Sequence, residues 1–149
     1  MARLLSAPSC ATAALRERGA PVPDAVTLEL RRWATEPFDW CALSVLAYVE
    51  RVRRRRLRPR PRVAGKVSAA RTARSAERFG AVAADAMRRL GCKPTTTPQR
   101  GDVGLVDLPG SGLTAAICTG RLWAARGDHA VVFVAAVPVL AWSVRCLRR

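Results

Sequence analysis

Aromatic residues, histidine and lysine are all scarce in this chain of 149 residues. Aromatic side chains make up 5% of the sequence and hydrophobic residues 50%, so Ala, Val and Leu must build the core. His129 is the single histidine, which limits histidine-dependent catalysis to one residue. The only lysines are Lys66 and Lys93, so nearly all of the net charge of +15 comes from arginine. This excess predicts a polyanionic partner, although an arginine- and alanine-rich composition is also typical of GC-rich coding sequences.

Paired cysteines are also missing. The five cysteines are spread over the whole chain and form no C-x-x-C pair; they are Cys10, Cys41, Cys92, Cys118 and Cys146. An odd number with this spacing is typical neither of a zinc site nor of a disulfide framework. The sequence therefore predicts a reducing environment, no metal and no cofactor.

Long hydrophobic runs are absent as well. A membrane-spanning helix needs about 18 uninterrupted apolar residues, and the longest candidate here, residues 130–142, is interrupted by Pro138. The first 20 residues contain too many charges and too short an apolar run for a secretory signal. We therefore expect no membrane span and no signal peptide.

The length predicts a single domain, over residues 24–149, preceded by an irregular extension of residues 1–23. Asp24 is a candidate cap for a helix over residues 25–34, and a central helix is expected over residues 41–54. Two short helices, residues 68–79 and 81–90, are predicted on either side of Gly80.

The second half of the chain has the character of a β-sheet. Five short apolar runs are separated by turn residues, and they cover residues 103–107, 113–119, 122–125, 131–137 and 140–146. Helices followed by strands in this way predict an α+β domain, with N-terminal helices packed on an antiparallel sheet of about five strands.

Cys41 is the first candidate functional residue, because it begins the predicted central helix. Backbone N–H groups without partners and the helix dipole lower the pKa of a thiol at this position, which is how many cysteine nucleophiles are activated. The alternative is that Cys41 is a small buried residue at the start of a core helix.

Arginine is concentrated between residues 51 and 62, in a run closed by Pro59 and Pro61. The candidate polyanion-binding residues are Arg51, Arg53, Arg54, Arg55, Arg56, Arg58, Arg60 and Arg62. No aromatic residue interrupts the run, so it offers no surface on which a base could stack. The alternative is a solvated, mobile linker, which is what runs of like charge usually form.

Several short motifs follow one another along the chain: Pro37-Phe38-Asp39-Trp40-Cys41, Arg100-Gly101-Asp102-Val103, Ile117-Cys118-Thr119-Gly120 and Ala141-Trp142-Ser143-Val144. In this order they resemble the NlpC-type papain-like cysteine peptidases. They are most similar to small NlpC-type proteins encoded among the tail genes of tailed phages and prophages. The resemblance covers about residues 30–144. It implies an NlpC-type fold, tail or tail-tip proteins as partners, and a virion-tail location after synthesis in the bacterial cytoplasm.

The resemblance also implies where catalytic residues should lie. Active relatives pair the cysteine with a histidine that opens the second strand, and the corresponding place here holds Thr114, which cannot act as a general base near neutral pH. The residue that would orient the histidine falls near residues 124–126, which offer no His, Asn or Gln. His129 is the one remaining candidate base for Cys41.

Three functions are compatible with these observations. The first is a tail-tip component that keeps the fold of the peptidase but not its catalytic pair, and serves in assembly. The second is an active tail-associated peptidoglycan endopeptidase, with Cys41 as nucleophile and His129 as base. The third is a basic nucleic-acid-binding protein that uses the arginines of residues 51–62. We rank them in this order, and leave open whether the chain is an enzyme.

Overall fold

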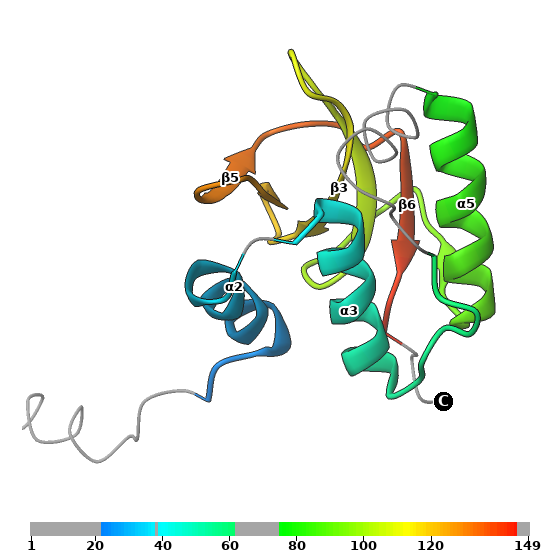
Figure 1. Ribbon diagram of the computed structural model, residues 1–149, viewed down its shortest axis with the longest axis horizontal. Helices are drawn as coiled ribbons and strands as arrows, with labels where there is room; N and C mark the ends of the chain where they lie inside the picture. The colour runs from blue at the N-terminus through cyan, green and yellow to red at the C-terminus, as the bar shows by residue number, and fades with distance from the viewer. Residues whose placement is uncertain (1–21, 38, 62–74, 146–149) are drawn as a thin grey trace, which may run out of the picture.

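The computed structural model describes residues 22–37, 39–61 and 75–145 of the chain. These residues form three helices and a six-stranded antiparallel sheet, which confirms the predicted α+β class (Figure 1). The helices are α2 (Ala25–Thr35), α3 (Cys41–Arg53) and α5 (Ala76–Arg89). The strands are β1 (Lys93–Pro94), β2 (Val103–Leu108), β3 (Gly112–Cys118), β4 (Trp123–Arg126), β5 (Val131–Val134) and β6 (Leu140–Ser143).

The strands lie in the order β1-β6-β2-β3-β4-β5. Neighbours in the sequence pair as hairpins from β2 to β5, and the longest pairing, β2 with β3, runs from Val103 opposite Ile117 to Leu108 opposite Gly112. The last strand, β6, returns to lie between β1 and β2. The sheet therefore combines a simple meander with one long return connection.

The main core lies between the sheet and the helices α3 and α5, which cover the same face (Figure 1). Helix α3 contributes Val45, Leu46 and Val49, which pack with Leu105 and Ile117 of the sheet. Side chains of α5 and of β6 extend the same cluster, namely Phe79, Ala86, Met87 and Trp142. Because side chains alternate along a strand, the opposite face buries a second, smaller cluster of Val106, Ala116, Cys118, Trp123, Ala125 and Ala141.

Helix α2 begins as the sequence predicts. The Asp24 side chain accepts a hydrogen bond from the Thr27 backbone N–H at 2.9 Å, which is the usual N-cap contact. One buried carboxylate ties α2 to α3, because Glu29 accepts hydrogen bonds from Trp33 Nε1 at 2.9 Å and from Arg51 Nε at 3.1 Å. The start of α2 is therefore set by local sequence, and its position by a polar contact with α3.

The described residues differ from the expectation at one helix, at one added strand and at two strand ends. Strand β5 ends at Val134, although the prediction ran to residue 137, and β6 ends at Ser143, before residues 144 and 145 of the predicted run. Gly80 lies inside the continuous helix α5 and does not divide it, because one glycine inside a helix costs only about 1 kcal/mol relative to alanine. The helix packs closely against β6 here, since a Cβ atom at Gly80 would lie 3.3 Å from Leu140 Cδ1. The sheet also has a sixth strand, β1, whose two residues pair with β6. Residues 68–74 of the predicted helix and residues 1–21 of the predicted extension lie outside the described residues. None of the described helices has the length and apolar character that crossing a membrane requires.

Candidate functional site

Cys41 is the first residue of α3, as predicted, and its thiol is partly buried against β3. Burial raises the pKa of the Cys41 thiol, although hydrogen bonds from the backbone N–H groups of Ala115 and Ala42 oppose the change. Desolvation therefore outweighs the effect of the helix start, and the sulfur is protonated at neutral pH. The sequence placed this residue correctly on the helix but could not show how strongly the sheet desolvates it.

The strand that faces Cys41 is β3, but Thr114 points to the other face of the sheet. Leu113, Ala115 and Ile117 belong to the core beneath α3, so strand alternation sends the Thr114 side chain away from the helix. Its hydroxyl donates a hydrogen bond to the Gly112 carbonyl oxygen at 3.1 Å. Ala115 therefore occupies the strand position nearest Cys41, and its methyl group cannot accept a proton.

The neighbouring strand β4 places Arg126 beside Ala115, within residues 124–126 where the resemblance implied an orienting residue. Ile117 pairs with Ala124, and continuing this register by two residues sets Arg126 beside Ala115. The side chain is buried, and its Nη2 donates to the carbonyl oxygens of Glu36 at 3.0 Å and Pro37 at 2.7 Å.

A third hydrogen bond runs from Arg126 Nη1 to Ser44 Oγ of α3, at 3.1 Å. Arg126 thus fastens β4 both to the segment that leads into α3 and to the first turn of the helix. A guanidinium is always charged in proteins and has no acceptor atom, so it cannot orient a histidine as an amide or carboxylate does. Sequence reasoning missed this role, because nothing in Trp123-Ala124-Ala125-Arg126 distinguishes a buried arginine from an exposed one.

His129 lies in the turn between β4 and β5 and is exposed. The turn is closed by a backbone hydrogen bond from Gly127 N–H to the Ala130 carbonyl oxygen at 2.8 Å. Within the described residues no hydrogen bond joins His129 to Cys41. The catalytic pairing of Cys41 with His129 therefore stays a prediction.

The Arg-Gly-Asp-Val motif before β2 forms structural contacts. Asp102 is buried, and its carboxylate accepts hydrogen bonds from the backbone N–H groups of Gln99 at 2.8 Å and Val144 at 3.2 Å. Arg100 Nε donates to Asp24 Oδ2 at 2.7 Å and holds the pKa of that carboxyl well below its usual range. The hydroxyl of Tyr48 donates to the Gly101 carbonyl oxygen at 2.8 Å, and burial raises the Tyr48 pKa to about 12. This motif therefore fastens α2 and α3 to the sheet.

Comparison with known families gives one match. A family described as a domain of unknown function, DUF6950, matches residues 17–144. The chain belongs to the DUF6950 family. No curated protein and no solved structure gives a significant match to it. All six strands and the helices α2, α3 and α5 fall inside the matched range, so Cys41 and Arg126 are positioned by the DUF6950 domain itself.

The arginine run of the DUF6950 domain does not form a uniform linker. Its first members belong to α3, where Arg51 bonds to Glu29 and Arg53 Nε donates to the Leu90 carbonyl oxygen at 3.1 Å. The chain then turns back, because the Leu57 side chain is buried and its N–H donates to Glu50 Oε1 at 3.0 Å. The run is thus divided between arginines used by the fold and arginines on its surface.

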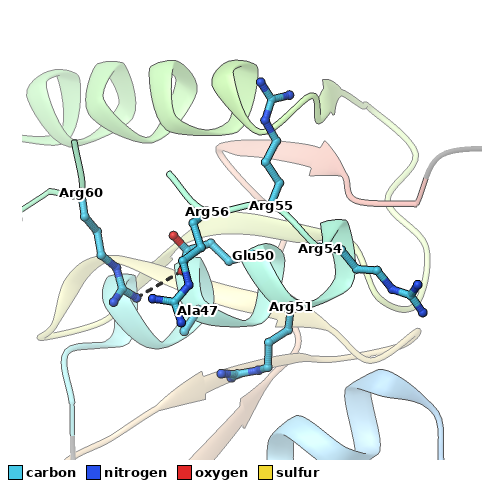
Figure 2. A pocket seen from close by; sticks show the side chains of 7 residues that line it. All are labelled: Ala47, Glu50, Arg51, Arg54, Arg55, Arg56 and Arg60. Atoms are coloured by element: carbon cyan, nitrogen blue, oxygen red, sulfur yellow. Dashed lines mark ion pairs between the residues drawn. The ribbon is translucent and has the colours of Figure 1, made fainter. Parts of the chain in front are cut away.

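An open cavity of about 410 Å³ lies at the C-terminal end of α3 and is lined mainly by arginines of this run (Figure 2). Five arginines line it, namely Arg51, Arg54, Arg55, Arg56 and Arg60. Arg58 is exposed but does not line the cavity, and Arg62 lies outside the described residues. Among the described residues, no group of three or more His, Cys, Asp or Glu side chains is arranged to hold a metal ion.

Proposed function

We propose that this member of the DUF6950 family is a non-hydrolytic component of a phage or prophage tail tip, with an NlpC-type fold that lacks a working catalytic pair. The proposed location is the virion tail, and the proposed partners are other tail proteins, with peptidoglycan as a further contact. The main observation against catalysis is the environment of Cys41. Its desolvated thiol faces Ala115, while the one histidine of the chain lies exposed in the β4–β5 turn.

The chemistry of amide hydrolysis explains why this observation weighs against activity. A thiol attacks an amide efficiently only as a thiolate, and a nearby base must accept its proton. Burial raises the Cys41 pKa and so disfavours the thiolate. The neighbouring position on β4 is taken by Arg126, whose hydrogen bonds already serve Ser44 and two backbone carbonyls. Both features favour a structural role.

The placement in a tail is supported by the resemblance of residues 30–144 to small NlpC-type tail proteins. The outer strand of the sheet, β5, exposes Val132 and Phe133, and the loop after it exposes Val137 and Val139. Exposed apolar side chains on an edge strand and on the loop that follows it are available for contact with other proteins. Mass spectrometry of purified particles from the encoding organism tests the placement, and consistent absence of the chain from the tails would contradict it.

The loss of catalysis is tested by the turbidity of purified peptidoglycan. We expect fresh, reduced wild-type protein to leave the turbidity unchanged, as the Cys41→Ala and His129→Ala variants do. Clearing by the wild-type protein that both substitutions abolish would overturn the proposal. That result would establish the alternative, an endopeptidase with Cys41 as nucleophile and His129 as base.

Thiol reactivity gives a second test that needs no substrate. We expect alkylation of Cys41 in the folded protein at pH 7 to be slower than alkylation of the same residue in urea, because burial disfavours the thiolate. Peptide mass spectrometry after a timed reaction with iodoacetamide distinguishes Cys41 from the other cysteines. A folded-state rate that exceeds the rate in urea would indicate an activated nucleophile.

A further inference from the structure

The C-terminal end of α3 carries positive charge that the fold does not neutralise. Arg51 is bonded to Glu29, and Arg60 lies 3.5 Å from Glu50. Arg54, Arg55 and Arg56 are exposed, and their side chains form no hydrogen bond or ion pair with the described residues. The C-terminal end of a helix carries a partial charge of about −0.5, so it cannot neutralise three guanidinium groups. We call Arg54, Arg55 and Arg56 the arginine turn.

The backbone beneath the arginine turn is well defined. Arg54 adopts the left-handed conformation, with φ of 52°, and its N–H donates to the Arg51 carbonyl oxygen at 3.2 Å. The next N–H, of Arg55, donates to the Glu50 carbonyl oxygen at 3.1 Å. The turn is then held from its other end by the buried side chain of Leu57. The three guanidinium groups are therefore presented from a fixed backbone, which lowers the entropic cost of using them together.

The lining of the cavity restricts the class of ligand. Among the described residues that line it, Ala47 is the only apolar one and none is aromatic. A protein partner normally needs an apolar or aromatic core at its interface, and single-stranded nucleic acid needs aromatic side chains on which bases stack. Neither is offered here. Contact with the backbone of a duplex needs only cationic and polar groups that reach phosphate oxygens.

The directions of the side chains fit several phosphates better than one. Figure 2 shows Arg56 and Arg60 beside Glu50, Arg55 pointing toward the opposite side of the turn, and Arg54 pointing outward from the end of α3. A single phosphate would need guanidinium groups that converge. Successive phosphates of a duplex lie along an extended line, and guanidinium groups bind their oxygens in a bidentate manner.

We propose that the arginine turn and the cavity beside it bind the phosphodiester backbone of double-stranded nucleic acid, independently of base sequence. This site is separate from Cys41, which lies at the other end of α3. The binding is also independent of the proposed tail function, because it requires neither peptidoglycan nor a tail partner. Peptidoglycan turbidity and nucleic-acid binding therefore succeed or fail separately.

The test compares two triple variants of equal charge. One replaces Arg54, Arg55 and Arg56 by Gln, and the control replaces Arg31, Arg78 and Arg121, which are exposed arginines on α2, on α5 and in the β3–β4 turn. Fluorescence anisotropy with labelled DNA duplexes of two unrelated sequences measures affinity over a salt series. We expect the first variant to bind at least tenfold more weakly than the control, and equally so for both sequences. Its salt dependence should fall by about 0.9 for each lost phosphate contact.

Equal weakening in the two triple variants would overturn the proposal, because overall charge would then explain the binding. No duplex binding by the wild-type protein at low salt would also overturn it. Circular dichroism checks that both variants remain folded, which we expect because all six side chains are exposed.

Two competitors and one further variant test the ligand class. We expect unlabelled single-stranded DNA and poly-glutamate of matched charge to displace the duplex less effectively than unlabelled duplex. Equal displacement by either one would contradict a duplex site. Glu50→Gln removes the only carboxylate among the described residues of the cavity, but keeps an oxygen that accepts from the Leu57 N–H. This variant should bind the duplex severalfold more tightly, and weaker binding would count against the site.

Discussion

The two ends of α3 use arginine in opposite ways. At the N-terminal end, the buried Arg126 reaches across from β4 and donates hydrogen bonds to Ser44 and to the carbonyls of Glu36 and Pro37. At the C-terminal end, Arg54, Arg55 and Arg56 are exposed and have no such partners among the described residues. The end that holds Cys41 is thus occupied by structural hydrogen bonds, whereas the other end is open to a ligand.

The largest expected effect tests the N-terminal end. Arg126→Met removes the donor from three acceptors in a largely buried position, so the free energy of unfolding should fall by about 2–4 kcal/mol. Urea denaturation followed by circular dichroism measures it. The control is Arg121→Met in the exposed β3–β4 turn, for which we expect a change within about 0.5 kcal/mol. An equal fall in the free energy of unfolding of the two variants would contradict a structural role for Arg126.

A second variant examines the C-terminal end itself, where Arg53 differs from the arginines that follow it. Arg53 donates from Nε to the Leu90 carbonyl oxygen at 3.1 Å and from Nη2 to the Gly91 carbonyl oxygen at 3.4 Å. Arg53→Met should therefore lower the free energy of unfolding by about 1–2 kcal/mol. A change no larger than that of an exposed arginine would contradict a structural role for the Arg53 hydrogen bonds.

A third test concerns Arg100, an exposed arginine that is paired with the carboxylate of Asp24. Asp24→Ala removes both the α2 cap and the ion pair with Arg100, and should cost about 1 kcal/mol near neutral pH. Because the folded pKa of Asp24 is lowered, this contribution is fully present above the pKa of about 3.9 in an unfolded chain.

The contribution is then lost as the pH falls from that value toward the lower folded pKa. The difference in unfolding free energy between wild-type protein and Asp24→Ala should therefore shrink between about pH 4 and pH 2. Urea denaturation at several pH values measures it, with Asp128→Ala as a control at an exposed carboxylate in a turn. A difference that is constant over this range would show that the charge of the Asp24 carboxylate does not contribute to the free energy of unfolding.

The smallest expected effect is at the arginine turn. Replacing Arg54, Arg55 and Arg56 by Gln should change the free energy of unfolding by no more than about 0.5 kcal/mol, because these side chains are exposed. Thermal denaturation of this triple variant beside wild-type protein measures it. A large loss would mean that the turn serves the fold, and the contrast between the two ends of α3 would disappear.

Local sequence signals were sufficient for most of the secondary structure. Asp24 and the apolar spacing after it predicted α2, and the apolar stretch after Cys41 predicted α3. Five short apolar runs separated by turn residues predicted β2 to β6. These signals act over a few residues, so they do not depend on the rest of the fold. The strand β1 had no such signal, since Lys93 and Pro94 have low β-propensity and pair only because β6 lies beside them.

The candidate site was less predictable, because its properties depend on contacts between residues that lie far apart in the sequence. The position of Cys41 at a helix start follows from local sequence, but its raised pKa depends on burial against β3. The direction of Thr114 depends on the register of β3, where a shift of one residue exchanges the two faces. Arg126 is buried because Ser44 and two carbonyls, about 80 or more residues earlier in the chain, satisfy its donors. Such contacts are set by the tertiary structure.

The position of β6 bears on the order in which the domain is assembled during synthesis. Its residues, Leu140–Ser143, are translated after those of every other strand described, yet they separate β1 from β2. The hairpins from β2 to β5 can form as they emerge from the ribosome, whereas Lys93 and Pro94 must wait for their partner. Until then, the edge of β2 has unpaired backbone groups that could pair with another chain. A released chain that ends before residue 140 should therefore aggregate more readily than the full chain.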